Sequence, residues 1–293
     1  MQRKQLRKLF QEKGIIVAPG AHNGVSAKVI EKIGFKAIYA TGYGASANVL
    51  GKPDIGLMSM SEMVTHMHNM ANATSLPIIA DADTGYGNAI NVMRTVQEYE
   101  QAGVAALQLE DQVMPKKCGH MMGRELISLK EMVGKIEAAV SARRDNDLMI
   151  IARTDARTKY GIEEAIRRGK AYEKAGADII FIESPESKDE MKLINQSIKA
   201  PTLANMVENG RTPLLPSAEL EKLGYKLVIF PVTSVLAEAN ILFRVFKELF
   251  ETGTTDKLVS DSLLFNFEEF NNFLGAKDMR NLEKKYLPQE VVE

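Results

Sequence analysis

The stretch NVMRTVQEYEQAGVAALQLED (residues 91–111) holds one complete helix-to-strand unit. Its first part spaces apolar residues with helical periodicity, and the run AALQLED (105–111) that follows is typical of a buried strand. Gly103 stands between the two, where a glycine in the left-handed conformation closes a helix at little cost. The strand ends in two charged residues, Glu110 and Asp111. The stretch therefore predicts a helix, a glycine cap and a buried strand with a charged end.

The same unit recurs along the chain. Apolar, β-branched runs that predict strands occupy residues 15–20, 36–42, 77–83, 105–111, 148–155, 178–184, 201–207 and 226–232. Helical patterns lie between these runs. The helices before the second, fourth, sixth and eighth strands end at Gly34, Gly103, Gly176 and Gly224. Strands three and seven are entered through SLP and KAP, because a proline can begin a strand but cannot continue a helix.

Eight such units predict an α/β fold, a closed (β/α)8 TIM-type barrel with a C-terminal helical extension. An open doubly wound sheet is the alternative, but no Gly-rich dinucleotide fingerprint follows the first strand. We expect the barrel to span residues 1–255 and to carry the active site. Residues 256–293 include SLLFNFEEFNNFLG (262–275), which has too much Leu and Phe to lie loose, so we expect a helical arm there.

The composition limits the classes of partner. Of the 293 residues 45% are hydrophobic, which is enough for a large core. Since 37 basic residues oppose 38 acidic ones, we expect neither a nucleic acid nor a membrane as a partner. A single cysteine excludes an internal disulfide framework and suits a reducing cytosol. The basic N-terminus lacks the apolar core of a signal peptide, and no apolar run reaches membrane-spanning length, so we expect a soluble cytoplasmic protein.

The C-terminal ends of the predicted strands are strongly polar, and in a barrel these ends form the active face. They carry Thr41, Gly42, Tyr43, Asp81, Asp83, Glu110, Asp111, Arg153, Thr154, Asp155, Glu183, Asn205, Pro231 and Thr233. Buried charge without compensation is costly, so such strand ends would be a poor way to stabilise a fold. Residues that converge on a cation and an anionic ligand compensate one another, and we therefore predict a binding site here.

The segment DADTGYG (81–87) suggests a metal at this face. Asp81 and Asp83 are two residues apart, so on an ideal strand both side chains point the same way. With Glu110 from the neighbouring strand they form an all-oxygen acidic set, which suits Mg²⁺ or Mn²⁺. The plainer interpretation is that Asp and Gly form turns at strand ends. The position of three carboxylates at adjacent strand ends favours the metal.

Two further residues suggest chemistry on a small anion. Arg153 offers a fixed positive fork, suited to a carboxylate or a developing alkoxide. Cys118, the only cysteine, stands among Lys116, Lys117 and His120 in a long loop, from about residue 112 to 127. Charged surroundings of this kind make the proton chemistry of a thiol useful, and long loops are often mobile lids. We expect this loop to bring the thiol onto bound substrate.

The motifs YATGYG (39–44), DADTGYG (81–87), LEDQVMPKKCGH (109–120) and IARTDA (151–156) together closely resemble the isocitrate lyase/phosphoenolpyruvate mutase superfamily. The likeness runs from about residue 10 to 250 and is to the short-chain lyases, which include the methylisocitrate and 2,3-dimethylmalate lyases. It implies a Mg²⁺-dependent barrel with Asp81 as metal ligand, and with Asp83, Glu110 and Asp54 nearby or acting through water. It also implies a substrate pocket formed by Thr41, Gly42, Tyr43, Cys118, Gly119, His120, Arg153, Glu183 and Asn205.

The resemblance further implies cleavage of a carbon–carbon bond in a 2-hydroxy dicarboxylate or tricarboxylate. Loss of the hydroxyl proton gives an alkoxide, which the metal and Arg153 stabilise and which collapses to an α-keto acid such as pyruvate. The departing carbanion is an enolate that Cys118 protonates, because a thiol of ordinary pKa, about 8.5, is mostly protonated near neutral pH. The initiating base is left open between Tyr43 and a metal-linked water. Exchange of a C-terminal helix within a homotetramer is also implied.

One departure from the family pattern bears on the substrate. Methylisocitrate lyases typically read P-x-S-x-x-R after the last strand, whereas PVTSVLAEAN (231–240) aligns Thr233 with the serine and Leu236 with the arginine. A third carboxylate beside Leu236 would lose its charge-assisted partner, at a cost of a few kcal/mol. We therefore expect a substituted 2-hydroxy dicarboxylate, with 2,3-dimethylmalate best, cleaved to pyruvate and propionate. Methylisocitrate lyase, oxaloacetate hydrolase and phosphoenolpyruvate or phosphonopyruvate mutase are the alternatives, and a barrel kept for binding is the non-enzymatic one.

Overall fold

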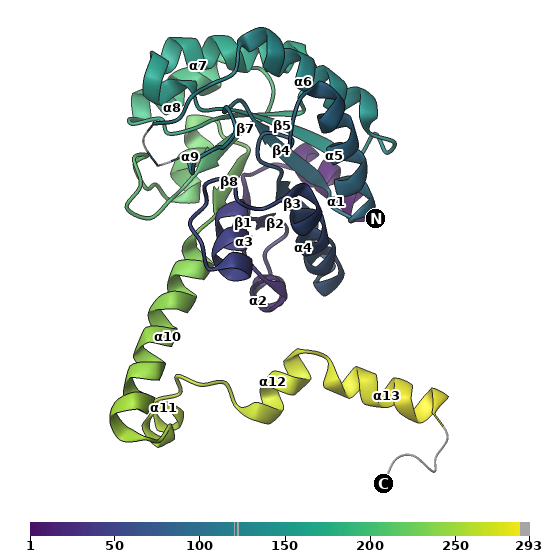
Figure 1. Ribbon diagram of the computed structural model, residues 1–293, viewed down its shortest axis with the longest axis vertical. Coiled ribbons are helices and arrows are strands. Elements are labelled where there is room, and N and C mark those ends of the chain that lie inside the picture. Colours follow the sequence, from purple (N-terminus) through teal and green to yellow (C-terminus); the bar gives the residue numbers. More distant parts are fainter. Residues whose placement is uncertain (120, 122, 288–293) are drawn as a thin grey trace. The chain divides into compact units, whose positions relative to one another are not determined.

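Eight parallel strands close into a barrel in sequence order, from β1 beside β2 around to β8 beside β1 (Figure 1). The computed structural model describes residues 1–119, 121 and 123–287. The strands are β1 Ile16–Ala21, β2 Ile38–Ala40, β3 Ile78–Asp81, β4 Ala106–Glu110, β5 Met149–Thr154, β6 Ile179–Ile182, β7 Thr202–Asn205 and β8 Leu227–Phe230. Each lies within its predicted range or extends one residue beyond it, and the prediction of a TIM-type barrel is confirmed.

Helices connect the strands and cover the barrel. They are α1 Gln2–Gln11, α2 Gly24–Ile33, α3 Gly42–Ala45, the π-helix η1 Ser46–Leu50, α4 Met60–Ala73, α5 Ala89–Gln101, α6 Leu129–Ala142, α7 Ala156–Lys174, α8 Lys188–Ser197 and α9 Ser217–Leu223. Gly34 after α2 and Gly224 after α9 have φ of 106° and 104°, so both helices end on the left-handed glycine that the sequence predicts.

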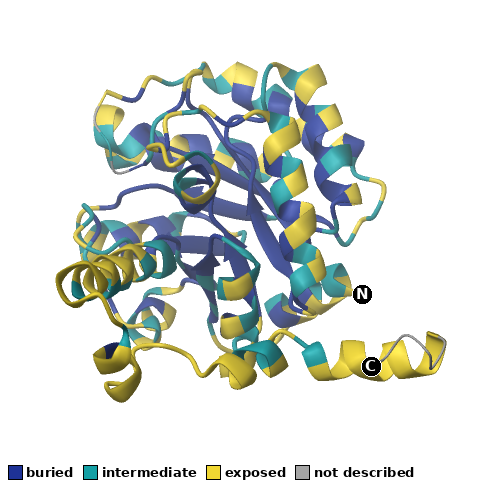
Figure 2. Cartoon of the chain, turned by 60° about the horizontal axis from the view of Figure 1, so that its bottom comes forward, coloured by how far each residue is buried: buried dark blue, intermediate teal, exposed yellow. Residues whose placement is uncertain are grey.

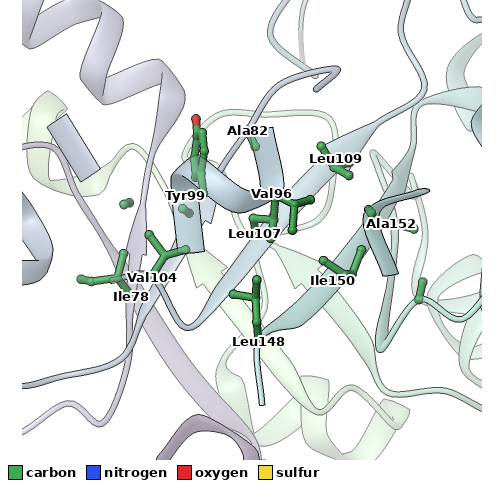
Figure 3. Packing of buried hydrophobic residues seen from close by; sticks show 14 of the residues in the cluster. Ile78, Ala82, Val96, Tyr99, Val104, Leu107, Leu109, Leu148, Ile150 and Ala152 are labelled. Carbon is green, nitrogen blue, oxygen red and sulfur yellow. The ribbon is translucent and has the colours of Figure 1, made fainter. Parts of the chain in front are cut away.

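The core has two layers because strand side chains alternate between the barrel interior and the surrounding helices. The interior layer contains Tyr39, Ile79, Ala106, Ile151, Phe181, Leu203 and Ile229, and Leu6 and Leu9 of α1 belong to the same cluster. The outer layer lies between strands and helices, where Leu107 of β4 and Ile150 of β5 join Val96 of α5 in one cluster (Figure 3). The strands are the most continuously buried part of the chain (Figure 2).

This alternation positions the polar strand ends. Residues two positions after an interior side chain point the same way, toward the barrel axis. Thr41, Asp81, Glu183, Asn205 and Pro231 each stand two residues after a member of the interior layer. Strand register then places neighbouring ends at one level, with Glu110 of β4 paired to Arg153 of β5. The polar residues therefore form the uppermost layer of the barrel interior.

The chain divides into two compact units, Met1–Leu236 and Ala237–Glu293. The division falls inside α10 (Thr233–Thr252), earlier than the expected boundary at 255/256, because this helix continues without a break and has no buried residue. The second unit also contains α11 Asp256–Ser260, α12 Phe267–Phe273 and α13 Ala276–Tyr286, in line with a helical C-terminal segment. Among the described residues, no helix combines the length and the apolar character needed to cross a membrane.

Candidate active site

A small cavity, about 40 Å³, lies at the C-terminal ends of the barrel strands. A space of this size holds little more than a water molecule or two, so a larger ligand would require the walls to move apart. Its walls are formed by Tyr39, Thr41, Tyr43, Asp54, Asp81, Cys118, Gly119, Arg153, Phe181, Glu183, Asn205, Val207, Ile229, Pro231 and Val232. Nine of the residues predicted for the site are among them. The predicted site residues therefore meet at one cavity, although they come from distant parts of the chain.

Among the described residues of the cavity wall Arg153 is the basic one, and carboxylates surround it. Its Nη1 lies 3.2 Å from Glu110 Oε2, and its Nη2 lies 3.4 Å from Glu183 Oε2. The ring of Phe181 lies beneath the guanidinium, 5.2 Å from its carbon, within the range of a cation–π contact. Burial lowers the pKa of Arg153, but the neighbouring carboxylates, led by Asp155, outweigh burial and raise the pKa well above its ordinary value. The guanidinium is therefore a permanent, fixed positive charge.

The four predicted metal ligands form an acidic cluster beside Arg153. All four are buried, with Asp54 and Asp81 on the cavity wall and Asp83 and Glu110 behind it. The Nζ of Lys116 lies 2.5 Å from Asp54 Oδ1 and 2.8 Å from Asp83 Oδ1. In the sequence Lys116 stands beside the thiol, but in the structure its ammonium belongs to the carboxylate cluster. Within the described chain, no three acidic, histidine or cysteine side chains stand close enough together to hold a metal ion on their own.

The protonation equilibria of this cluster are strongly displaced by burial. Burial raises the pKa of Asp83 to about 6, even though Lys116 attracts the ionised form. Burial likewise raises the pKa of Glu110 well above its ordinary value, against the attraction of Arg153. For Lys116 burial works downward, but Asp83 and Asp54 prevail and raise the pKa. The Lys116 ammonium therefore stays charged, while burial disfavours the ionised forms of Asp83 and Glu110.

These residues fit a hard divalent cation. Both Glu110 oxygens are buried and neither accepts a well-directed hydrogen bond from a described residue, although Oε2 lies 3.2 Å from Arg153 Nη1. Asp81 accepts only from backbone in the described contacts, at 3.3 Å from the N–H of Gly42 and 3.1 Å from that of Asp83. Four carboxylates against Lys116 and Arg153 leave a formal negative excess that a cation would offset. Mg²⁺ keeps several waters and takes one or two carboxylates directly, so a cluster without three convergent ligands suits it.

The loop that carries the thiol reaches the same cavity. Cys118 lines it, and the Cys118 backbone N–H donates to the carbonyl of Asp54 at 3.2 Å. Gly119 accepts a hydrogen bond at its carbonyl from Ser184 Oγ, 3.2 Å away. The third member of the motif, His120, lies outside the described residues. The thiol and Arg153 therefore face one small space, and mobility of the loop stays a prediction.

Some predicted residues do not line the cavity. Gly42 stands behind Asp81, and its added Cβ would lie 2.7 Å from that carboxylate. Asp83 follows the end of β3 with φ of 47°, so the strand alternation used to align it with Asp81 stops before it. The Thr233 hydroxyl donates to Glu208, and Leu236 is 44% exposed. The position of Leu236 therefore gives no support to the expected contact between this side chain and the substrate.

Other cavity residues were missed in the sequence. Tyr39, Phe181 and Ile229 belong to the apolar interior layer, and Val207 and Val232 follow β7 and β8. Their apolar character gave no functional signal, because a buried strand shows the same pattern. A signal was nevertheless present. Thr41 and Glu183 stand two residues after Tyr39 and Phe181, so a polar strand end also marks the interior side chain beneath it as part of the floor of the site.

The comparisons with known proteins identify the family. Residues 6–250 match the family model described as phosphoenolpyruvate phosphomutase. The chain is 56% identical over 282 residues to 2,3-dimethylmalate lyase of Eubacterium barkeri, covering 96% of this chain and 97% of that one. It is 46% identical over 273 residues to a 2-methylisocitrate lyase of Aeropyrum pernix, covering 93% and 87%. The chain therefore belongs to the phosphoenolpyruvate mutase/isocitrate lyase superfamily, and the predicted membership is confirmed.

Solved structures agree. A crystal structure of 2,3-dimethylmalate lyase superposes with a TM-score of 0.91 at 35% identity, covering 97% of this chain and 95% of that one. Phosphonopyruvate hydrolase in complex with oxalate and Mg²⁺ superposes with a TM-score of 0.89 at 34% identity, covering 98% and 100%. The prediction of an enzyme from this superfamily of lyases and mutases is confirmed, and metal dependence is a property of the superfamily.

Proposed function

We propose that the protein is a carbon–carbon lyase that cleaves a substituted 2-hydroxy dicarboxylate, with 2,3-dimethylmalate favoured, to pyruvate and propionate. The observation that carries the proposal is the meeting of Arg153, Asp81 and Cys118 at one cavity. A guanidinium, a carboxylate for a metal and a thiol are the groups that such a cleavage needs. The 56% identity with a 2,3-dimethylmalate lyase over nearly the full length of both chains supports the particular substrate.

The proposed cofactor is Mg²⁺, with Mn²⁺ as the alternative. Asp81 would hold the ion directly, and Asp54, Asp83 and Glu110 would hold its water ligands. When bound, such an ion supplies Lewis acidity to the oxygens of the substrate. Lys116 balances Asp54 and Asp83 beside it, which keeps these carboxylates from repelling one another. The ion is therefore proposed to complete a charge balance that the chain alone leaves negative.

The proposed steps begin at the substrate hydroxyl. A base removes its proton, and Tyr43 on the cavity wall is the side-chain candidate. Arg153 stabilises the negative charge that develops on this oxygen, because its guanidinium is fixed and fully charged. The C2–C3 bond then breaks, and its electron pair passes to the C3 fragment, an enolate of propionate. The Cys118 thiol gives its proton to that carbon, and the thiolate regains a proton from the group that acted as base.

The cavity walls favour a dicarboxylate over a tricarboxylate. Among the described residues that line it, Arg153 is the basic one, and Glu110, Asp155 and Glu183 already engage it. A third substrate carboxylate would find no free positive partner there and would be partly desolvated, which is costly. Val207, Ile229 and Val232 instead offer apolar contact, worth roughly 0.8 kcal/mol per buried methyl. These walls therefore favour 2,3-dimethylmalate without any contact from Leu236.

We also propose a cytoplasmic homotetramer with small-molecule substrates and neither nucleic acid nor membrane as a partner. The division into a barrel with the active site (1–255) and an arm exchanged between subunits (256–293) belongs to this proposal. Phe265 and Phe267 of this arm support it, since they are 63% and 84% exposed. Aromatic side chains exposed in this way are typical of an interface with another chain.

The experiment that tests the proposal compares substrates. The kcat/KM of the purified protein with Mg²⁺ is measured for 2,3-dimethylmalate, 2-methylisocitrate, citramalate, malate and oxaloacetate by following α-keto acid release, or oxalate for oxaloacetate. We expect 2,3-dimethylmalate to exceed 2-methylisocitrate by at least tenfold. A preference for 2-methylisocitrate would contradict the dicarboxylate argument. Hydrolysis of oxaloacetate without cleavage of any hydroxy acid would contradict the lyase.

A further inference from the structure

Asp155 lies next to the active site without lining its cavity. It follows the last residue of β5 and is 2% exposed. Its carboxylate forms a bidentate pair with Arg153: Oδ2 accepts a hydrogen bond from Arg153 Nε and Oδ1 accepts one from Arg153 Nη2, both at 3.0 Å. Such a fork-to-fork pair sets the plane of a guanidinium as well as its position. Asp155 therefore determines how Arg153 presents its remaining N–H groups.

The remaining contacts of Arg153 depend on that plane. Nη1 faces Glu110, Nη2 reaches toward Glu183, and the flat face rests over Phe181. The first two ion pairs are longer than the Asp155 contacts, at 3.2 and 3.4 Å, so they constrain the guanidinium less. Of these described partners, Asp155 is the one that makes two short, directed hydrogen bonds.

Asp155 is itself held by a rigid frame. Its backbone N–H donates to Asp111 Oδ1 at 3.0 Å, and the neighbouring Thr154 hydroxyl donates to Asp111 Oδ2 at 2.7 Å. Asp111 in turn accepts from Tyr172 Oη at 2.7 Å and from Arg168 Nη1 at 2.9 Å, both on α7. The backbone that carries Asp155 is therefore fixed between β4, β5 and α7.

A second guanidinium contacts the same carboxylate. Arg124 donates from Nη1 to Asp155 Oδ1 and from Nη2 to Thr158 Oγ1 at 2.5 Å. Arg124 lies six residues after Cys118 in the same loop. Its two contacts therefore anchor the C-terminal part of this loop to Asp155, just after β5, and to Thr158 of α7. Burial raises the pKa of Asp155, but Arg153 and Arg124 outweigh burial and keep the pKa below its ordinary value. The pair of cations therefore keeps the buried carboxylate ionised.

We propose that Asp155 is the positioning residue of Arg153, and that Arg124 acts through Asp155 by holding its carboxylate in the two-point geometry. The inference rests on the proposed function, because it concerns the orientation of the group that stabilises the alkoxide. Stabilising a charge that develops during the reaction requires a guanidinium fixed beforehand, and displacement by about 1 Å costs about a hundredfold in rate.

The test is a double-mutant cycle on kcat. Asp155→Asn removes the charge and one acceptor but keeps the shape, and we expect kcat to fall about a hundredfold while KM changes less than threefold. Arg124→Gln should lower kcat about tenfold. Because Arg124 acts through Asp155, the double variant should be no slower than Asp155→Asn alone. The matched control is Glu190→Gln, which breaks the similar two-point pair with Arg157 at 2.8 and 3.0 Å and should leave kcat unchanged.

Several results would overturn the inference. A kcat for Asp155→Asn within threefold of wild type, or an equal loss in Glu190→Gln, would remove the positioning role. Losses that multiply in the double variant would show that Arg124 acts independently. If Asp155→Asn does not fold, Arg124→Lys takes its place, because lysine keeps the positive charge but loses the planar guanidinium. We expect its kcat to fall about tenfold, and an unchanged kcat would contradict the inference.

Failure of the proposed function can be distinguished from failure of this inference. The ratios are measured on whichever hydroxy or oxo acid the wild type turns over, so a different natural substrate leaves them meaningful. Crystal structures of the wild type and of Asp155→Asn, or of Arg124→Lys in its place, provide a measurement that does not depend on turnover. We expect the Arg153 guanidinium to shift by about 1 Å or to rotate out of its plane, the size of displacement that costs rate. An unmoved guanidinium would contradict the inference.

Discussion

Gly119→Ala is the smallest change that should disable the site. A Cβ at this position would lie 2.3 Å from Arg153 Nη2 and 2.6 Å from Glu183 Oε2. Ordinary contacts between heavy atoms are about 3.5 Å or longer, so the guanidinium or the loop must move by roughly 1 Å. A displacement of that size costs about a hundredfold in rate. We expect kcat/KM to fall by about this factor.

The free energy of unfolding of Gly119→Ala should change only modestly. Overpacking costs about 1–3 kcal/mol, and we expect the lower end because residue 119 lies in a loop that can yield. The measurements are α-keto acid release and denaturant unfolding. Gly134→Ala is the matched control, since no heavy atom lies within 4 Å of its Cβ on α6, and it should gain about 0.5–1 kcal/mol without a change in kcat. A folded Gly119→Ala enzyme with kcat/KM within threefold of wild type would refute the reasoning.

Three further predictions follow from the site and the barrel. Cys118→Ser replaces the proton donor by a far weaker acid, so kcat should fall about 10²- to 10⁴-fold with little change in KM; near-normal kcat would make the thiol a bystander. Chelation should abolish turnover and added Mg²⁺ restore it, whereas Asp81→Ala should stay inactive in excess metal; activity after exhaustive chelation would exclude the metal. Gly20→Ala would place a Cβ 2.3 Å from the Pro231 carbonyl oxygen where β1 meets β8, so chemical denaturation should show a loss of about 3 kcal/mol, and unchanged stability would contradict this tight closure.

The barrel was predictable because its units repeat the same physical pattern. Eight buried strands alternate with helical stretches, glycines close the helices before four of the strands, and each repeat supports the others. Strand ends were less predictable. The expected strand 36–42 gives only Ile38–Ala40, because Thr41 caps a helix by accepting from the N–H of Gly44 at 3.2 Å. An apolar run with Gly and Ala fits both structures, so periodicity alone cannot place the boundary.

The site was predictable where a single strand end supplied the signal. Asp81, Glu110 and Arg153 stand out because charge at the end of an apolar strand needs a partner. What depended on three-dimensional packing could not be read from the sequence. Lys116 enters the carboxylate cluster from a loop, and Asp155 contacts Arg124 from 31 positions away. Nothing in local spacing distinguishes such residues from solvated charges.

The most direct test of the lyase is the fate of 2,3-dimethylmalate itself. The protein is incubated with this substrate and Mg²⁺ in D₂O, and the products are followed by NMR. If the C2–C3 bond breaks and the enolate takes a solvent-exchanged proton from Cys118, pyruvate and propionate must form in equal amounts, with one deuterium at C2 of propionate. Pyruvate without propionate, or an unchanged substrate in a preparation that turns over 2-methylisocitrate, would contradict the proposed function.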